Sequence, residues 1–214
     1  MTETEAFWED LYLSRAQGAA IWSGKVNAQL AAEVADLAPG RALDIGCGEG
    51  GDAVHLAALG WQVTAIDVSP TALARTEAAA AAAGVASQVA TERHDLASSF
   101  PAGRFDLVVA MFFQSPLELA REDVLHRAAE SLDPGGHLVV VEHGSGPTWS
   151  DAASDELEEH HHMEFATPEE LVALIDLDPA HFTPVTVESR TRAVTHEGRS
   201  GTVLDTVVVV RREG

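Results

Sequence analysis

The chain has 214 residues, of which 46% are hydrophobic, enough for one domain with a substantial core. Its formal charge of -21 argues against binding to duplex DNA or RNA, which requires clustered lysine and arginine. Residues 1–10 lack a basic segment followed by an apolar one, and no window approaches about 18 continuous apolar residues. We therefore expect a cytoplasmic protein with no nucleic-acid partner and no membrane segment. No pattern in the sequence indicates an oligomeric state.

The first 34 residues are expected to form a helical cap, followed by a single α/β domain over residues 35–214. An amphipathic first helix is predicted by apolar side chains at i, i+1, i+4 and i+5: Phe7, Trp8, Leu11 and Tyr12. A second helix is expected to run to Leu37. Aromatic side chains at this spacing either cover a ligand site or only dock the helix on the sheet, and the spacing leaves both open.

Beyond the cap, apolar β-rich runs alternate with helical patterns, which predicts βαβ units and a parallel, doubly wound sheet. The expected strands are 41–45, 62–67, 89–95, 105–113 and 137–142. The expected helices are 52–59, 70–83, 118–132 and 168–175, with a turn at 133–136. Two final strands, 182–194 and 202–211, alternate in polarity and are joined by a turn-like segment, which predicts a C-terminal antiparallel hairpin.

A glycine-rich loop, Gly46-Cys-Gly-Glu-Gly50, follows the first strand, where it lets the backbone turn tightly and approach a ligand. With Gly51 the loop also satisfies the dinucleotide pattern GxGxxG. Asp44 separates the two interpretations, because a carboxylate beside a pyrophosphate would place two negative charges together. An acid at this position favours a cationic ligand group instead.

The segment from Asp44 to Gly50 resembles the first motif, (D/E)xGxGxG, of the class I S-adenosylmethionine-dependent methyltransferases. Asp44, Gly46, Gly48 and Gly50 match that motif position by position. The resemblance extends from about residue 35 to 211. It implies a Rossmann-like α/β fold with a mostly parallel seven-stranded sheet, in which the last strand lies antiparallel between its neighbours.

The resemblance also implies S-adenosylmethionine as cofactor and assigns its contacts. Asp67 ends the second strand, where an acid binds both ribose hydroxyls, as it also does in NAD enzymes. Asp95 ends the third strand, where the family's acid meets the adenine amino group, although an aspartate after a strand is also a common turn cap. The other expected cofactor-binding residues are Val68, Leu96, Ala110 and Met111.

Trp22 is expected either to pack on the sulfonium by a cation–π contact or only to dock the cap on the sheet. The pattern FWEDLY…IWSG over residues 7–24 resembles a small-molecule branch of the family that includes tellurite-resistance and thiopurine methyltransferases. The segment 145–165 is longer than an ordinary connection and is expected to form a lid or substrate loop on the same side of the sheet as the cap.

Histidines mark the acceptor side of the predicted site. His143 ends the fifth strand and is a candidate general base, or else an ordinary loop histidine. The consecutive histidines 160–162 point about 100° apart on a helix, so at most Glu158 and His162 could share an ion. We expect a solvated acidic face there and no metal.

These patterns predict in-line methyl transfer from S-adenosylmethionine to a small-molecule acceptor. An NAD-dependent oxidoreductase is the first alternative. Such an enzyme would need a catalytic pair of tyrosine and lysine, or a histidine with a second domain. It is disfavoured because the only tyrosine, Tyr12, and the only lysine, Lys25, both precede the glycine loop. A non-catalytic subunit that binds the cofactor is the second.

Overall fold

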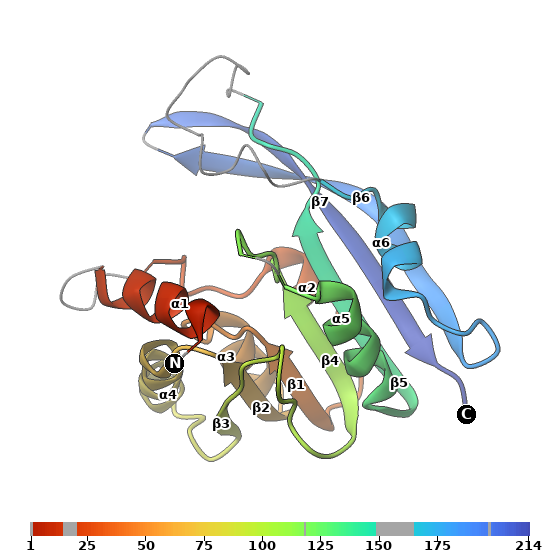
Figure 1. The fold of residues 1–214 in the computed structure, drawn as a ribbon, viewed down its shortest axis with the longest axis horizontal. Coiled ribbons are helices and arrows are strands. Elements are labelled where there is room, and N and C mark those ends of the chain that lie inside the picture. Colours follow the sequence, from red (N-terminus) through yellow and green to blue (C-terminus); the bar gives the residue numbers. More distant parts are fainter. Residues whose placement is uncertain (1, 15–20, 118, 149–164, 197) are drawn as a thin grey trace.

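The computed structural model describes residues 2–14, 21–117, 119–148, 165–196 and 198–214. Within them the chain forms one seven-stranded sheet in the order β3-β2-β1-β4-β5-β7-β6 (Figure 1). The strands are β1 Arg41–Ile45, β2 Gln62–Asp67, β3 Val89–Arg93, β4 Phe105–Met111, β5 Leu132–His143, β6 Phe182–His196 and β7 Arg199–Arg212. Strands β1 to β5 pair in parallel, whereas β7 is antiparallel to both β5 and β6. The predicted fold class is confirmed.

Helices pack on both faces of this sheet. They are α1 Glu3–Ser14, α2 Ala28–Glu33, α3 Gly51–Ala58, α4 Pro70–Ala82, α5 Arg121–Glu130 and α6 Pro168–Ile175. One core cluster joins α2, α3 and α4 to one face, and a second joins α5 and α6 to the other. Strand β4 lies between these clusters and contributes apolar side chains to both, which explains its nearly continuous apolar sequence.

Local sequence signals account for several of the boundaries. Ser69 caps α4 by accepting the N–H of Ala72, and proline occupies the first helical position. Thr167 and Glu170 form the predicted capping box of α6. Each device satisfies N–H groups that the first helical turn leaves without a partner.

Other boundaries differ from the prediction. The helix expected at 118–132 spans 121–130, and the second helix of the cap ends at Glu33 instead of Leu37. The expected turn at 133–136 lies within β5, where the pairing register with β4 shifts. The strand expected to reach residue 113 ends at Met111, because Phe112 has a φ of 52° and leaves the extended conformation. The hairpin strands are longer than expected, since β6 and β7 pair up to His196 and Arg199.

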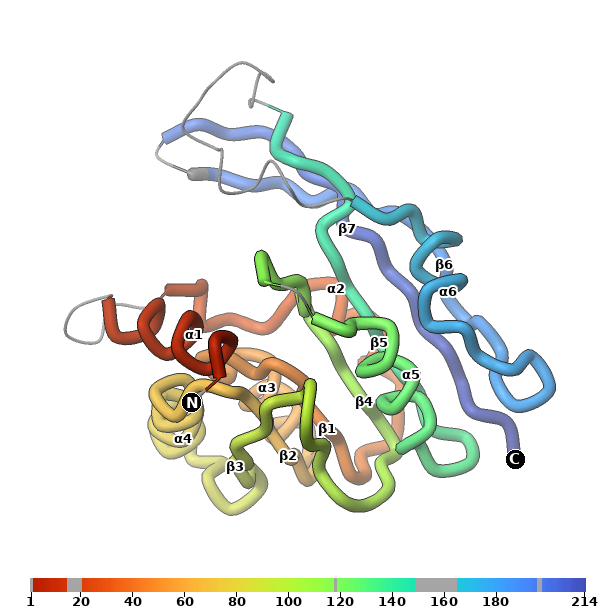
Figure 2. The backbone as a smooth tube through the Cα atoms, viewed as in Figure 1, coloured from red at the N-terminus to blue at the C-terminus, as the bar shows by residue number. Residues whose placement is uncertain are grey.

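Two parts of the chain extend beyond the carboxyl ends of the parallel strands (Figure 2). Helix α1 lies beside α4, and the far part of the β6–β7 hairpin extends past the end of β5. After β5, Gly144 and Thr148 donate backbone hydrogen bonds to Leu204 and Thr202 of β7. Among the described residues, none of the helices is both long and apolar enough to cross a membrane.

Candidate cofactor and acceptor site

The glycine loop connects β1 to α3 and packs against α4. Gly46, Gly48 and Gly50 have φ values of 68°, 54° and 81°, a backbone region that side chains with a Cβ rarely adopt. A Cβ at Gly50 would lie 2.8 Å from Oγ1 of Thr76, a buried residue of α4. The first two glycines face aromatic side chains, and the third permits close packing of loop and helix.

Asp44 lies under this loop and is only 2% exposed. Its Oδ2 atom is buried without a hydrogen-bond partner. Burial raises the pKa of Asp44 well above its ordinary value, and the nearby carboxylates of Asp52 and Asp67 raise it further. Burial also raises the pKa of Asp52 to about 6, although the N–H of Asn27, 2.7 Å away, lowers it. This buried acidic group favours a cation at the glycine loop.

Asp67, at the end of β2, fixes the shape of the glycine loop. One carboxylate oxygen accepts the N–H of Gly48 at 3.1 Å, and the other accepts that of Ser69 at 2.9 Å. Burial raises the pKa of Asp67, while these N–H groups lower it. The carbonyl oxygen of the adjacent Val68 accepts a hydrogen bond of 3.0 Å from Nε of Arg93. The structure therefore brings Asp44 and Asp67 together on either side of the loop, as the sequence predicted.

Asp95 lies beyond the end of β3 and has the bonding of a turn cap. Its Oδ1 accepts the N–H of Ala97 at 3.1 Å, and its carbonyl oxygen accepts the N–H groups of Ser98 and Ser99. Its Oδ2 accepts the hydroxyl of Thr2 at 3.0 Å. The turn-cap interpretation is therefore confirmed, and a contact of Asp95 with the adenine stays a prediction.

Helix α1 is attached to the start of α4. Both oxygens of Glu9 accept hydroxyl hydrogen bonds of 2.6 Å, from Ser69 and Thr71, and Oε2 also accepts the N–H of Thr71. Glu5 pairs with Arg93 at 3.0 Å. These contacts place the cap over the ends of β2 and β3, next to Asp67. Phe7 of the predicted apolar face is 39% exposed, so that part of the amphipathic stripe does not pack on the sheet.

Glu49 of the glycine loop holds the chain that follows α1. It accepts the N–H groups of Ile21 and Trp22 and pairs with Arg75 at 2.5 Å. Arg75 also donates to the carbonyl oxygen of Tyr12 at 2.9 Å. Sequence reasoning missed this clamp, because residue 49 is a variable position of the motif and its partners are remote in the chain.

Trp22 lies on the glycine loop and is 52% exposed. Its Nε1 donates to the hydroxyl of Tyr12 at 3.0 Å. A Cβ at Gly48 would lie 3.0 Å from that hydroxyl and 3.4 Å from the indole, and a Cβ at Gly46 would lie 3.0 Å from Phe113. Aromatic side chains thus occupy the space that a side chain at Gly46 or Gly48 would need.

The acceptor side lies at the ends of β4 and β5. Ala110 is fully buried and Met111 is half-buried. The ring of Phe112 stacks on His143, with centroids 4.2 Å apart and planes 17° apart. The N–H of His143 donates to the side-chain oxygen of Gln114 at 3.0 Å. The left-handed Phe112 turns both its own side chain and that of Met111 toward the α2–α4 face.

The hairpin contributes an ion pair to this side, which the sequence did not reveal. Arg192 of β6 donates from Nε and Nη2 to the two oxygens of the fully buried Asp205, at 2.8 and 3.1 Å. Gln29 of α2 donates to the same carboxylate at 3.2 Å. The guanidinium lies 5.7 Å from the centroid of the Phe112 ring, so the hairpin packs against the end of β4.

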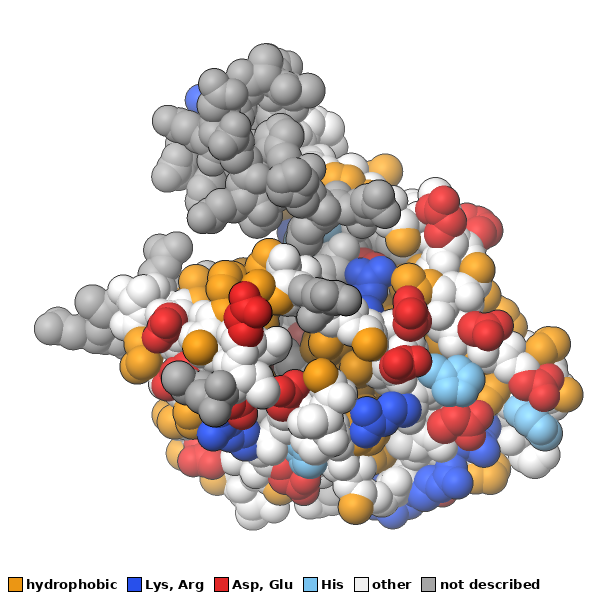
Figure 3. All heavy atoms as spheres, viewed as in Figure 1, with side chains coloured by type: hydrophobic (Ala, Val, Ile, Leu, Met, Phe, Trp, Pro, Cys, Tyr) orange, Lys and Arg blue, Asp and Glu red, His pale blue; other side chains and the backbone are white. Residues whose placement is uncertain are grey.

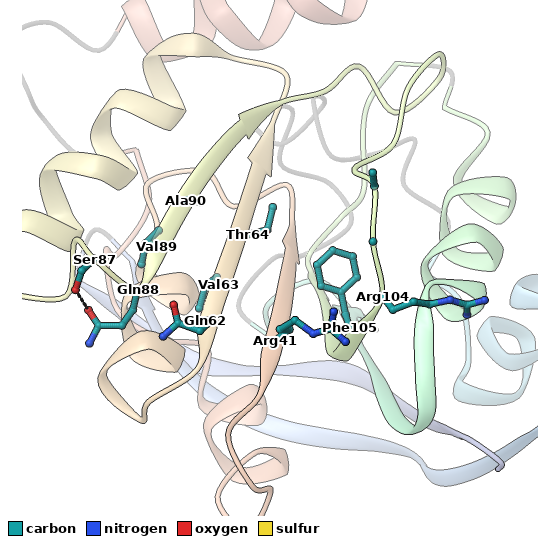
Figure 4. A pocket seen from close by; sticks show the side chains of 12 residues that line it. Arg41, Gln62, Val63, Thr64, Ser87, Gln88, Val89, Ala90, Arg104 and Phe105 are labelled. Atoms are coloured by element: carbon teal, nitrogen blue, oxygen red, sulfur yellow. Dashed lines mark hydrogen bonds between the residues drawn. The ribbon is translucent and has the colours of Figure 1, made fainter.

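A hollow of about 320 Å³ lies at the opposite, amino-terminal edge of the sheet (Figure 4). Arg41, Gln62, Val89 and Phe105, at the starts of four strands, line it. The connection over residues 94–104, which contains no helix, contributes residues 102–104 to its lining. Ligands of open α/β sheets bind at the other edge, and this hollow contains no residue of the predicted site.

The remaining predictions concern the segment after β5. Residues 144–148 run beside β7, at the carboxyl edge of the sheet. Residues 149–164, with Glu158 and the histidines 160–162, lie outside the described residues. The expected lid and solvated acidic face therefore stay predictions. Leu96, the last predicted cofactor residue, is 8% exposed and belongs to the α5–α6 core cluster.

The fold, the glycine loop and the acids at the strand ends define a nucleotide-binding Rossmann-like domain. Residues 42–136 match the family model described as a methyltransferase domain. The chain thus carries the domain of the class I S-adenosylmethionine-dependent methyltransferases, and the resemblance seen in the glycine motif is confirmed.

Curated proteins and solved structures agree with this assignment. A probable chloroplastic tocopherol O-methyltransferase of Oryza sativa subsp. japonica is 31% identical over 70% of this chain and 39% of its own length. A ubiquinone biosynthesis O-methyltransferase of Xanthomonas euvesicatoria pv. vesicatoria is 32% identical over 64% of this chain and 61% of its own. The chain thus spans about two fifths to three fifths of these relatives.

The same fold is found in a solved structure that concerns the conversion of a disulfide bond into a thioacetal group during echinomycin biosynthesis. Its TM-score is 0.71 at 23% identity, with 98% of this chain and 93% of that chain covered. The finer likeness to the tellurite-resistance and thiopurine branch stays a prediction.

Proposed function

We propose that the protein transfers a methyl group from S-adenosylmethionine to a small-molecule acceptor. The buried, unpaired oxygen of Asp44 is the observation that carries this proposal. A carboxylate in a dry site is costly unless a cation or a hydrogen-bond donor reaches it. S-adenosylmethionine carries an ammonium and a sulfonium and has no phosphate, so its charge suits the acidic group around Asp44.

The residues at the strand ends fit the parts of this cofactor. Asp44 would hold the ammonium end, and Asp67 would accept the ribose hydroxyls. Asp95 and Leu96 would border the adenine, while Val68, Ala110 and Met111 would line the remaining walls. Gly46, Gly48 and Gly50 leave the backbone open to close approach.

The bound cofactor would supply an activated methyl group on a sulfonium. The protein's own contribution is then to align the acceptor and exclude water, an orientation effect that supplies about 7–11 kcal/mol in favourable cases. The cap and the hairpin lie on either side of the β4 end and suit this role. His143, stacked on Phe112, remains a candidate base on the acceptor side.

A small-molecule acceptor is supported by charge and by the relatives. The formal charge of -21 disfavours a nucleic-acid substrate, although relatives named for ribosomal RNA and a ribosomal protein also match. On the face seen in Figure 3, the described basic side chains are interspersed with acidic ones and form no broad patch. The likeness to the tocopherol and ubiquinone O-methyltransferases supports a small acceptor for this chain.

Ligand binding tests the proposed function directly. We expect isothermal titration calorimetry to detect S-adenosylhomocysteine binding and no NAD binding, because Asp44 opposes a pyrophosphate and attracts an ammonium. Adenosine alone serves as a control for the part that the two ligands share. Binding of NAD without a response to S-adenosylhomocysteine would instead favour the oxidoreductase alternative.

Trp22→Ala tests whether the indole meets the sulfonium. We expect the variant to bind S-adenosylmethionine about 2- to 30-fold more weakly, as a cation–π contact of about 0.5–2 kcal/mol implies. Binding of S-adenosylhomocysteine, which lacks the sulfonium charge, should change much less, and Trp22→Phe should lose only part of the effect. An equal loss for both ligands would show that Trp22 only docks the cap.

A further inference from the structure

Glu142, near the end of β5, is a buried acid that the proposed function does not use. It is 1% exposed, and neither of its carboxylate oxygens has a hydrogen-bond partner. Within the described residues, Asp44 is the other side chain with such an orphaned oxygen. Buried polar groups of this kind require an explanation, because desolvation is costly and no hydrogen bond within the protein offsets it. The proposed cofactor accounts for Asp44, which leaves Glu142.

Glu142 lies at the edge of the sheet where the acceptor is expected. The preceding residue, Val141, pairs with Met111 at the end of β4, and its carbonyl oxygen accepts the N–H of Phe112 at 2.7 Å. Adjacent strands are about 4.8 Å apart. The backbone of Glu142 is therefore about one strand spacing from the end of β4, where Ala110 and Met111 would line the cofactor site.

Among the described residues, one cation faces this carboxylate. Nη1 of Arg121, the first residue of α5, lies 3.3 Å from Oε1 of Glu142. Burial raises the pKa of Glu142, and Arg121 lowers it. The neighbouring His143 is also tied to the segment before α5, through Gln114. Both ends of the connection between β4 and α5 thus contact the last two residues of β5.

The other elements around Glu142 contribute no second described cation. Its register partner on β7 is Thr206, whose hydroxyl donates to the carbonyl oxygen of Ala166. At the start of α6, the carboxylate of Glu170 is held in the capping box of Thr167. Asp205 and His143 follow the alternation of the strands and lie on the opposite face. Arg121 is therefore the described charged group whose removal should alter the basicity of Glu142.

We propose that Glu142 is the catalytic proton acceptor, and hence that the methyl acceptor carries a proton on its attacking nitrogen, oxygen or sulfur. This inference rests on the proposed function. The acceptor's bond to hydrogen breaks, the proton moves to a carboxylate oxygen of Glu142, and the electron pair left behind forms the bond to the methyl carbon. The sulfonium sulfur keeps the electron pair of its broken bond to carbon.

Three variants test this role. Glu142→Gln keeps the shape of the side chain but removes the base, Arg121→Gln keeps the base but removes its cation, and Glu122→Gln is an exposed control on the same helix. Turnover of labelled S-adenosylmethionine with thiophenol, aniline and phenol is measured against pH. Binding of S-adenosylhomocysteine and thermal unfolding are measured for each variant.

We expect Glu142→Gln to lose about 10²- to 10⁴-fold in kcat while it binds S-adenosylhomocysteine normally. Arg121→Gln should move the acidic limb of kcat/KM to higher pH, because Arg121 lowers the pKa of Glu142. Without ligand, the melting temperature of the wild type should fall relative to Glu142→Gln as pH rises above 4.5, since the folded state holds the Glu142 proton more tightly than the unfolded state.

Several results would overturn the proposal. One is a Glu142→Gln variant with wild-type kcat; another is an acidic limb that disappears in His143→Gln and persists in Glu142→Gln. If Glu142→Gln does not fold, an acidic limb of kcat/KM that is not shifted in Arg121→Gln would overturn the proposal. If no probe is turned over, an equal pH dependence of unfolding in the wild type and in Glu142→Gln would overturn the proposal. Failure of the wild type to bind S-adenosylhomocysteine would overturn the proposed function itself.

Discussion

Asp44→Asn is expected to weaken S-adenosylhomocysteine binding by about 1.5–3 kcal/mol, roughly 10- to 150-fold, and to raise the melting temperature of the ligand-free protein. The two effects have one cause. Asp44 is buried with an unpaired oxygen beside two other acids, so its charge destabilises the ligand-free fold. The same charge would be stabilised by the ammonium of the cofactor.

The pH dependence of this effect follows from the raised pKa of Asp44. The folded state holds the Asp44 proton more tightly than the unfolded state, in which the pKa is near 3.8. Ligand-free wild-type protein should therefore lose stability relative to Asp44→Asn as pH rises above 3.8 and through the higher pKa of the folded state. Each kcal/mol corresponds to about 2–4 °C in melting temperature for a chain of this size.

Thermal unfolding between pH 4 and 8 and calorimetry at pH 7.5 measure the two effects. Asp106→Asn is a matched control, because Asp106 accepts the N–H of Arg41 at the opposite edge of the sheet, and an asparagine oxygen can replace that contact. Unchanged affinity in Asp44→Asn would mean that the cofactor does not use the buried acid. A lower melting temperature would mean that the unpaired oxygen does not destabilise the fold.

The sequence predicted the elements that depend on local signals. The strand cores, the caps at Ser69 and Thr167 and the C-terminal hairpin follow from residues within a few positions of one another. The glycine loop is also local, because its motif directly precedes the helix that it opens. Predicted boundaries were wrong where backbone geometry overrode composition. At Phe112, the left-handed conformation ends an apolar strand two residues earlier than predicted.

The acids predicted for the site were found at or near the ends of strands. Asp44 and Asp67 meet because parallel neighbouring strands end at the same edge of the sheet. The clamp of Glu49 on Trp22 and the pair of Arg192 with Asp205 were not predicted, because each joins positions whose contact depends on strand register and on the path of the cap. Glu142 was not among the predicted site residues, since burial without a hydrogen-bond partner is visible only in the fold.

Gly50→Ala is expected to destabilise the protein by about 3 kcal/mol or more and to abolish cofactor binding under ordinary conditions. A non-glycine residue at a φ of 81° costs about 1–2 kcal/mol in backbone strain. The added methyl group would also lie 2.8 Å from both Oγ1 and Cγ2 of Thr76 and 3.0 Å from its Cα, and overpacking of this kind costs about 1–3 kcal/mol.

Thr76 cannot easily move away. It is fully buried, its side chain is branched at Cβ, and its hydroxyl donates to the carbonyl oxygen of Gly48 at 3.0 Å. The methyl group must therefore displace the glycine loop from α4. Because Gly48 also donates to Asp67, the displacement would separate the loop from the acid that would bind the ribose.

Gly84→Ala separates strain from overpacking. Gly84 has a similar φ of 75°, but a Cβ there would meet nothing within 4 Å, so we expect a loss of only about 1–2 kcal/mol and normal binding of S-adenosylhomocysteine. Chemical denaturation and calorimetry measure both quantities. In the double variant Gly50→Ala/Thr76→Ala, stability should recover relative to the sum of the single variants, because the contact between the two side chains is gone. If the two losses simply add, the hydroxyl and methyl groups of Thr76 do not cause the destabilisation, which then comes from the backbone conformation at Gly50 and its close approach to the backbone of α4.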